Sequence, residues 1–379
     1  MSKNKIFNKE LKNRKKGDPL FRNIKYCNRC CMPETNEFQK FDEMGICNAC
    51  RSSEQKMKID WNAREEKLAK IFSDAKKNSG NNYDCIVPIS GGKDSCFQLH
   101  IIVKIFKLTP LAVTFSHNWW TKTGKYNLEN ILEKLGVDHM MYTPNRGLIN
   151  KLAKKSLKMI GDSCWHCHAG VWSYPFHVAT KFKIPLIIYG ESPADFSGQK
   201  TYEEQKILDK NFSKEGLIHS IKVSPSEMID KSLSEKDLNL FFPPSDKELT
   251  QAGVQGIFLG DYIFWDHERQ SEFLKKEYNW REDKVEGSYK YYKSVECKMA
   301  GVHDYAKYIK RGFGRGTDFA SQDVRAGLIS REEGFDLAVK TDSKRPKTLD
   351  YYLKITGYSE KQFEDILISH RNKKLHNKF

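Results

Sequence analysis

Short apolar runs alternate along the middle of the chain with longer segments in which apolar residues recur every three or four positions. The short runs are typical of strands buried on both faces, and the longer spacing is typical of helices that pack on one side. The predicted strands are 84–89, 111–115, 139–142 and 185–189, and the predicted helices are 61–77, 95–106, 125–135, 147–159 and a stretch ending near 181. Strands alternating with helices predict an α/β fold with a parallel sheet. Pro88 has no backbone N–H, so we expect it at a strand end.

The pattern changes at both ends of this region. Residues 1–22 are rich in Lys and Asn, residues 198–250 are polar and irregular, and 241–245 resemble a linker or hinge. From Ile257 onward the chain is predicted to be helical, with capping boxes at Ser330–Glu333 and Ser359–Gln362. We therefore expect three parts: a basic arm with a cysteine-rich module over 1–60, an α/β domain over 61–250, and a mainly helical region over 251–379.

The composition restricts the class of protein. The 379 residues are 39% hydrophobic and carry a formal net charge of +15. No apolar run approaches the roughly 20 residues that span a bilayer, and no apolar stretch follows the basic N-terminus, so we expect a cytoplasmic protein. The charge favours phosphate-rich partners such as nucleotides, nucleotide sugars, RNA or an anionic membrane surface, or else it serves solubility and an acidic protein partner; charge alone does not choose among them.

The most informative motif is Ser90-Gly91-Gly92-Lys93-Asp94-Ser95, which follows the first strand and opens a helix. Two glycines allow a tight turn and close approach of a ligand, and the amides at a helix N-terminus form an anion site. The serine hydroxyls and Lys93 can neutralise phosphate charge, and Asp94 can bind magnesium. The spacing is not that of a Walker P-loop. It resembles the PP-loop of the ATP pyrophosphatases, which implies ATP cleavage between the α and β phosphates.

Ligands of parallel sheets bind beyond the carboxyl ends of the strands. Two further strand ends therefore become candidates. Phe115 or Ser116 is expected near adenine. Gly190 and Glu191 follow the strand 185–189, and Glu191 or Asp195 is expected near magnesium.

A four-cysteine zinc site is predicted near the N-terminus. Cys27-x-x-Cys30 and Cys47-x-x-Cys50 are separated by sixteen residues, a spacing typical of a zinc ribbon or knuckle. A closed set of four thiolates is structural, because it leaves no open position for catalysis. Cys31 is the spare cysteine.

A second cysteine group, Cys164-Trp165-His166-Cys167-His168, lies in the α/β domain. Three interpretations stay open. Cys164, Cys167 and His168 can hold an iron–sulfur cluster or second metal, with Cys297 as a third sulfur. The segment can instead line the substrate, with His166 or His168 carrying a proton. It can also be packing under the tryptophans.

The glycine-rich basic stretch 310–318 contains Arg311 and Arg315. A loop of this composition can close over phosphates or a sugar acid, or it can be an ordinary solvated turn.

Taken together, the paired cysteines, the segment 85–95, the residues 189–192 and the stretch 312–331 resemble the N-acetyl sugar amidotransferases, over about residues 20–370. The resemblance implies an adenine nucleotide alpha-hydrolase-like domain with an N-terminal zinc ribbon and a helical C-terminal region. It implies that ATP adenylates the acetamido oxygen of an N-acetylated sugar, and that ammonia displaces AMP to leave an acetamidino group. Such enzymes serve bacterial surface-glycan pathways.

The same resemblance implies ATP, Mg²⁺ and Zn²⁺ as cofactors, with Lys93, Asp94 and Ser95 as catalytic residues. Ammonia is expected from a glutaminase subunit through a cyclase-like channelling subunit, because no glutaminase nucleophile is recognisable in this chain. An alternative is a tRNA-thiolating PP-loop enzyme, which also joins cysteine-rich modules to this motif. Cys297 is the only cysteine after 167, however, so a second C-terminal zinc module is missing. A third possibility is a zinc-ribbon nucleic-acid adaptor that senses nucleotide.

Overall fold

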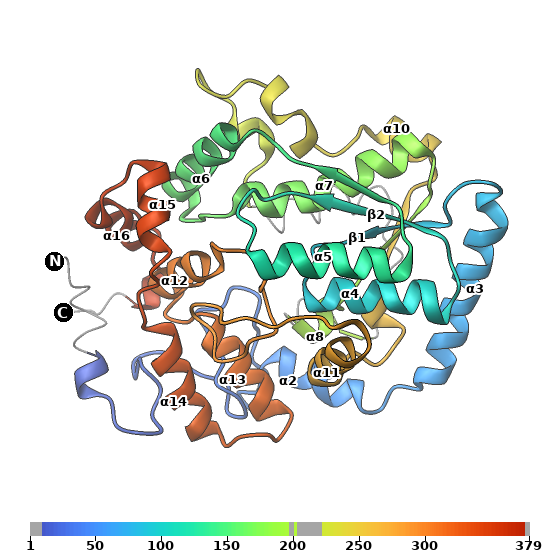
Figure 1. Ribbon diagram of the computed structural model, residues 1–379. Coiled ribbons are helices and arrows are strands. Elements are labelled where there is room, and N and C mark those ends of the chain that lie inside the picture. Colours follow the sequence, from blue (N-terminus) through green and yellow to red (C-terminus); the bar gives the residue numbers. More distant parts are fainter. Residues whose placement is uncertain (1–9, 197–200, 203–221, 376–379) are drawn as a thin grey trace.

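Five parallel strands form a single sheet in the computed structural model, which describes residues 10–196, 201–202 and 222–375 (Figure 1). The strand order is β3-β2-β1-β4-β5, the order expected for a doubly wound sheet. The strands are β1 (Cys85–Pro88), β2 (Pro110–Phe115), β3 (His139–Tyr142), β4 (Leu186–Tyr189) and β5 (Gln255–Phe258). The predicted α/β class is confirmed, and Pro88 is the last residue of its strand, as expected.

Alternate residues of the strands face two separate apolar layers. Ile86 packs in a cluster with α6 (Arg146–Ile160) and α7 (Trp165–Phe182). Its neighbours Cys85 and Val87 pack on the other side with helices α3 (Trp61–Ser79), α4 (Lys93–His100), α5 (Lys122–Leu135) and α11 (His267–Tyr278). This period of two explains why the strands read as unbroken apolar runs, since both faces are covered.

The structure differs from the sequence prediction at two elements. The helix predicted over 95–106 ends at His100 and continues as a π-helical turn, Ile101–Ile105. The fifth strand, β5, lies where the helical region was expected to begin, so one strand of the sheet falls beyond the predicted boundary at residue 250. Its first two residues, Gln255 and Gly256, interrupt the apolar pattern, and only the pairing with β4 makes the segment a strand.

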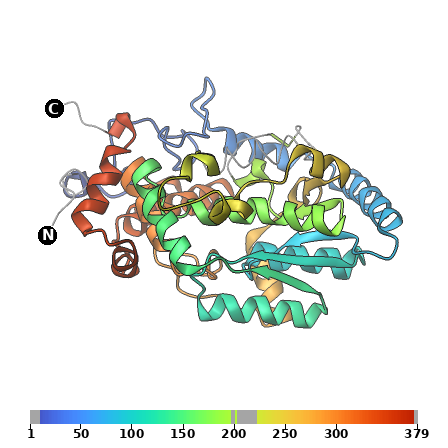
Figure 2. The same cartoon turned by 90° about the horizontal axis from the view of Figure 1, so that it is seen from above.

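The C-terminal region is helical, as predicted, and lies at one end of the sheet domain (Figure 2). Both predicted capping boxes are present, at the starts of α14 and α16. The helices are α12 (Ala300–Arg311), α13 (Arg315–Arg325), α14 (Arg331–Asp342), α15 (Leu349–Thr356) and α16 (Glu360–Ser369). Thr348 and Tyr351 line a cavity together with Ser116, which places this region against the carboxyl ends of the strands.

Short elements complete the described chain: α2 (Asn48–Lys56), α8 (Pro193–Phe196), α10 (Asp246–Gln251), and the 3-10 turns Pro225–Met228, Lys236–Phe241, Leu259–Asp261 and Lys373–Leu375. The hinge expected at 241–245 is anchored instead. The ring of Phe241 is buried and stacks on Trp165 at 5.7 Å between centroids. Much of the irregular stretch predicted over 198–250 lies outside the described residues. Among those that are described, no helix is long and apolar enough to cross a membrane, and the cytoplasmic location stays a prediction.

Candidate active site

The turn between β1 and α4 has the geometry of an anion cradle. Gly91 has a φ of 76°, and a Cβ there would lie 2.6 Å from the carbonyl oxygen of Gly124 and 2.8 Å from the amide of Leu128. Only glycine fits this position. Gly92 is the N-cap of α4, so the first amides of the helix and its positive dipole end face the turn.

Two serine hydroxyls hold the turn in shape. The amide of Gly92 donates to Ser90 Oγ at 3.3 Å, and the amide of Ser90 donates to Ser95 Oγ at 3.2 Å. Ser95 Oγ in turn donates to the carbonyl of Gly92 at 3.0 Å. The predicted residues Ser90 to Ser95 therefore form one preorganised loop.

Lys93 is buried, with 2% of its surface exposed. Its ammonium lies 2.9 Å from His267 Nδ1 and 3.2 Å from Gln270 Oε1, and it is paired with Asp94. Burial lowers the pKa of Lys93, although Asp94 and Glu191 act against that shift. The positive charge is thus fixed at the start of α4 by partners from α11.

Asp94 and Glu191, both predicted near magnesium, are joined through one histidine. His267 Nδ1 lies 3.4 Å from Asp94 Oδ1, and its Nε2 lies 2.9 Å from Glu191 Oε1. Burial works to raise the pKa of both carboxyl groups. Lys93, His267 and Lys293 outweigh it at Asp94, and Lys293 with His267 does so at Glu191, so both pKa values lie below their ordinary range. Both groups are ionised at neutral pH.

The other two candidates at this strand end do not offer a free group. Gly190 packs closely, because a Cβ there would lie 3.0 Å from Gln98 Oε1, and its carbonyl accepts from the amide of Gly260 at 2.8 Å. Asp195 is paired with Lys56 at 2.6 Å. Asp195 therefore ties Lys56, which follows the cysteine-rich module, to the sheet domain.

Phe115 and Ser116 separate at the end of β2. The Phe115 side chain is 4% exposed and packs on Phe241 at 5.4 Å between centroids, directly against Gly170 of α7. Strand alternation turns the Phe115 ring into the core, and the expectation that Phe115 or Ser116 lies near adenine stays a prediction.

Ser116, by contrast, lines a cavity of about 450 Å³. The cavity lies beside the cradle, since β1 and β2 are paired up to Pro88 and Val113. Its three lining cations, Lys125, Arg146 and Lys298, form no ion pair within the described part of the chain. The other lining residues are Asn118, Trp119, Trp120, Met141, Thr143, Thr348 and Tyr351.

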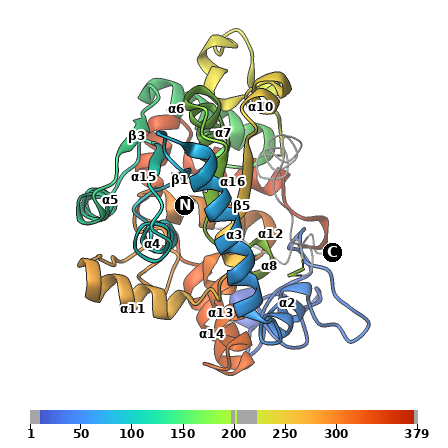
Figure 3. The same ribbon diagram turned by 90° about the vertical axis from the view of Figure 1, so that its right-hand side faces the viewer.

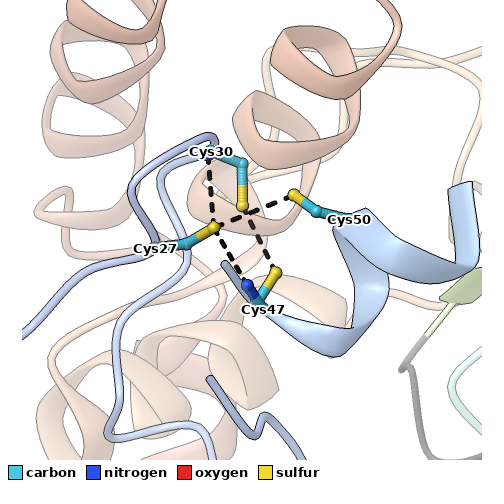
Figure 4. Close-up of side chains that lie close together, drawn as sticks. All are labelled: Cys27, Cys30, Cys47 and Cys50. Carbon is cyan, nitrogen blue, oxygen red and sulfur yellow. Dashed lines mark hydrogen bonds between the residues drawn. The ribbon is translucent and has the colours of Figure 1, made fainter. Parts of the chain in front are cut away.

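The four predicted ribbon cysteines converge in one buried cluster (Figure 4). The sulfurs of Cys27 and Cys50 lie 3.8 Å apart, and those of Cys30 and Cys47 lie 3.7 Å apart. Tetrahedral zinc with Zn–S bonds of about 2.3 Å requires sulfurs about 3.8 Å apart. The cluster therefore has the shape of a zinc site and can bind zinc.

This module is seated on the C-terminal helices, and Figure 3 shows α2 beside α13 and α14. Arg331 donates to the carbonyls of Cys30 and Cys27 at 3.1 and 2.8 Å. Arg325 lies 3.9 Å from the Cys30 sulfur and favours its thiolate. The spare Cys31 is buried against Gly334, and burial raises the pKa of its thiol to about 12.

The second cysteine group does not assemble into a metal site. Within the described ranges, only the ribbon cysteines bring three or more possible ligands within metal-binding distance of one another. Burial raises the pKa values of both Cys164 and Cys167, so both thiols are neutral. His168 lies 3.7 Å from Asp162. The metal interpretation is not supported, and packing describes this group best.

His166 is also an unsuitable proton carrier. It is fully buried, and its ring packs edge-on to Trp119 at 4.7 Å. Burial lowers the pKa of His166 to about 3, so it stays neutral near pH 7.

The glycine-rich basic stretch binds an anion that belongs to the protein itself. The carboxylate of Asp342 accepts from the amides of Gly314 and Gly316, at 2.8 and 2.7 Å. Arg315 is paired with Asp304, and Arg311 with Glu37 at 3.1 Å. Internal carboxylates thus pair with both guanidinium groups, which favours a structural role for Arg311 and Arg315, and a phosphate loop there stays an untested prediction.

Several residues around the cradle carried no recognisable sequence signal. Trp280 Nε1 donates to the carbonyl of Gly91 at 3.0 Å, and Trp265 Nε1 donates to Asp94 at 3.0 Å. With His267, Gln270 and Lys293 they come from the segment after β5, well over a hundred residues from the motif. No spacing rule links positions so far apart.

Comparison with known proteins bears on the C-terminal helices. Residues 286–378 match a family model described as "LPS biosynthesis protein WbpG-like, C-terminal domain". The chain is also similar to the uncharacterized protein MJ1599 of Methanocaldococcus jannaschii, at 26% identity over 172 residues; the match covers 45% of this chain and 60% of that protein.

A solved structure, that of NMN synthetase from Francisella tularensis, aligns with a TM-score of 0.31 and 17% identity, over 57% of this chain and 87% of that one. These values are too low to carry an argument. The link to lipopolysaccharide biosynthesis therefore rests on the C-terminal match.

Proposed function

We propose that this protein is an ATP-dependent amidotransferase of surface-glycan biosynthesis. It adenylates the acetamido oxygen of an N-acetylated sugar, either a nucleotide sugar or a nonulosonic acid, and ammonia then displaces AMP to leave an acetamidino group. The observation that carries this proposal is the joining of a preorganised anion cradle at Ser90–Ser95 to a WbpG-like C-terminal domain in one chain.

The chemistry requires activation of a poor electrophile. Amide resonance gives the C–N bond partial double-bond character, with a rotation barrier of roughly 18–20 kcal/mol. Transfer of AMP to the amide oxygen releases pyrophosphate and converts that oxygen into a leaving group. Ammonia adds to the carbon, loses a proton, and the C–O bond to AMP breaks. The loop amides, the helix dipole and Lys93 would stabilise the pyrophosphate charge as it develops.

The adjacent cavity is suited to the acceptor. Its three cations without an ion pair, Lys125, Arg146 and Lys298, favour an anionic ligand, and Trp120 offers an apolar ring surface. Such a lining fits the carboxylate of a sugar acid or the diphosphate of a nucleotide sugar. The cavity also receives residues of the WbpG-like domain, Lys298, Thr348 and Tyr351, which would let that domain select the sugar.

The remaining groups take supporting roles in this proposal. Mg²⁺ would accompany ATP at the cradle and supply charge neutralisation. Zn²⁺ would be structural, held by the four ribbon cysteines. Ammonia would come from a glutaminase subunit through a cyclase-like partner.

The test uses Lys93→Met, which keeps the packing volume of the buried stem and removes the charge. With ammonium chloride and a panel of N-acetylated nucleotide sugars and sugar acids, the wild-type protein should release pyrophosphate and AMP. We expect the variant to lose at least a hundredfold in rate, while Lys104→Met, at an exposed position, stays near wild type. Formation of ADP would contradict the proposal, and tRNA-dependent sulfur transfer would favour a thiolating enzyme.

A further inference from the structure

Backbone contacts with the segment before α5 hold Glu296 beside the cradle. Its carbonyl accepts from the amide of Thr121 at 3.0 Å, and two residues on, the amide of Lys298 donates to the carbonyl of Trp119 at 2.8 Å. A Cβ on Gly124 would lie only 2.3 Å from the Glu296 Cα. The backbone of this segment therefore has little freedom to move away from the loop.

The Glu296 side chain reaches the anion cradle itself. A Cβ on Gly92, the N-cap of α4, would lie 3.2 Å from Glu296 Oε2. This oxygen is buried and has no hydrogen-bond partner among the described residues. Glu191 Oε1 also lacks a hydrogen bond, but it lies 2.9 Å from His267 Nε2, and Asp94 Oδ1 accepts from Trp265.

A buried carboxylate oxygen without a partner is costly, and the cost grows when a polyphosphate binds beside it. Arg315 is the cation that acts electrostatically on Glu296. Its guanidinium already pairs with Asp304 and donates a hydrogen bond to Ser294. Burial raises the pKa of Glu296, although its own backbone amide and Arg315 act in the opposite direction. A bound cation would compensate this oxygen in the loaded state.

We propose that Glu296 is a ligand of the divalent cation that accompanies ATP, and that it acts together with Asp94. This inference rests on the proposed function. Magnesium is commonly held by one or two carboxylates together with substrate phosphates. The cation removes the repulsion between Glu296 and the phosphates and supplies the missing partner to Oε2. Glu296 lies within the residues that match the WbpG-like domain, so that domain would complete the nucleotide site.

The first experiment measures binding of α,β-methylene-ATP by calorimetry, with Mg²⁺ and with EDTA. We expect Mg²⁺ to tighten binding to the wild-type protein at least tenfold. Glu296→Gln, which has the same shape without the charge, should bind in EDTA at least as tightly as wild type, because the repulsion is absent, but should gain less than threefold from Mg²⁺. Glu282→Gln, at an exposed residue near Lys275, should behave as wild type.

The outcomes are distinguishable. An unchanged Mg²⁺ gain in Glu296→Gln overturns the ligand role and leaves the proposed function intact. Failure of the wild-type protein to bind the nucleotide with or without Mg²⁺ overturns the proposed function, and the ligand role with it.

A second measurement uses the wild-type chain, so it does not depend on the folding of a variant. Fe²⁺ with α,β-methylene-ATP replaces Mg²⁺, and ascorbate with peroxide produces local backbone cleavage. We expect cuts near both 90–95 and 294–298, detected by mass spectrometry. Cleavage near 90–95 and 191 without any near 296 overturns the assignment.

Discussion

Two regions of this protein carry Cys-x-x-Cys turns, and they have different fates. In the N-terminal module, the residues between Cys27 and Cys30 are exposed Asn28 and Arg29. In the sheet domain, the residues between Cys164 and Cys167 are Trp165 and His166, both fully buried. The first turn meets the matching pair Cys47 and Cys50 and forms a four-sulfur cluster, whereas the second becomes the buried start of α7.

The difference shows what a cysteine spacing can and cannot specify. One Cys-x-x-Cys turn places two sulfurs on one side, but a closed zinc site needs four ligands in a tetrahedron. The ribbon brings its second pair from a nearby turn. The second group has only Cys297 as a possible sulfur partner. An antiparallel bridge pairs Cys297 with Trp120.

The largest expected effect comes from breaking the ribbon cluster. Cys50→Ser should reduce the zinc content from about one ion per chain to near zero and destabilise the module, since structural zinc contributes on the order of 10 kcal/mol. Metal content by mass spectrometry and thermal unfolding would measure this. The matched variant Cys167→Ser should keep its zinc; loss of metal there would mean that the two regions are more alike than the geometry indicates.

The second-largest expected effect is a loss of folding stability at low pH, caused by His166 in the turn between Cys164 and Cys167. His166 has a pKa of about 3 in the fold, against 6.5 in the unfolded chain. Below pH 6.5 the unfolded state binds the extra proton, so stability is lost as the pH falls from there toward 3. Between pH 7 and 5 this residue alone should lower the free energy of unfolding by about 2 kcal/mol.

Urea unfolding at pH 7 and pH 5 compares the wild-type protein with His166→Phe. The variant should lose about 2 kcal/mol less across this interval. Acid release of zinc affects both proteins and cancels in the difference. An identical pH dependence would show that His166 is not held neutral in the core.

The smallest expected effect is at Cys164, where we assign only packing. Cys164→Ala should lower the free energy of unfolding by about 1 kcal/mol, through lost contacts and a small cavity. Zinc content and nucleotide binding should not change. A brown colour in the purified wild-type protein that disappears in this variant would restore the cluster interpretation.

Much of the fold could be predicted because its signals are local. The apolar runs of β1 to β4, the spacing of the ribbon cysteines and the capping boxes each lie within a short window of sequence. Strand β5 was missed because Gln255 and Gly256 interrupt its apolar pattern. Arg315 was assigned to a ligand because its partner, Asp304, could not be seen as a neighbour from the order of residues.

The sequence by itself determined that residues 90–95 form a tight glycine turn at the start of a helix and that four cysteines can meet, because glycine conformations and short loops act over a few residues. Only the tertiary structure decided what surrounds that turn. Trp265, His267 and Trp280 contact this turn, although they lie far from it along the sequence. The Glu296 side chain lies beside Gly92. Packing and charge compensation between distant segments depend on distances in space, and one chain's residue order does not state them.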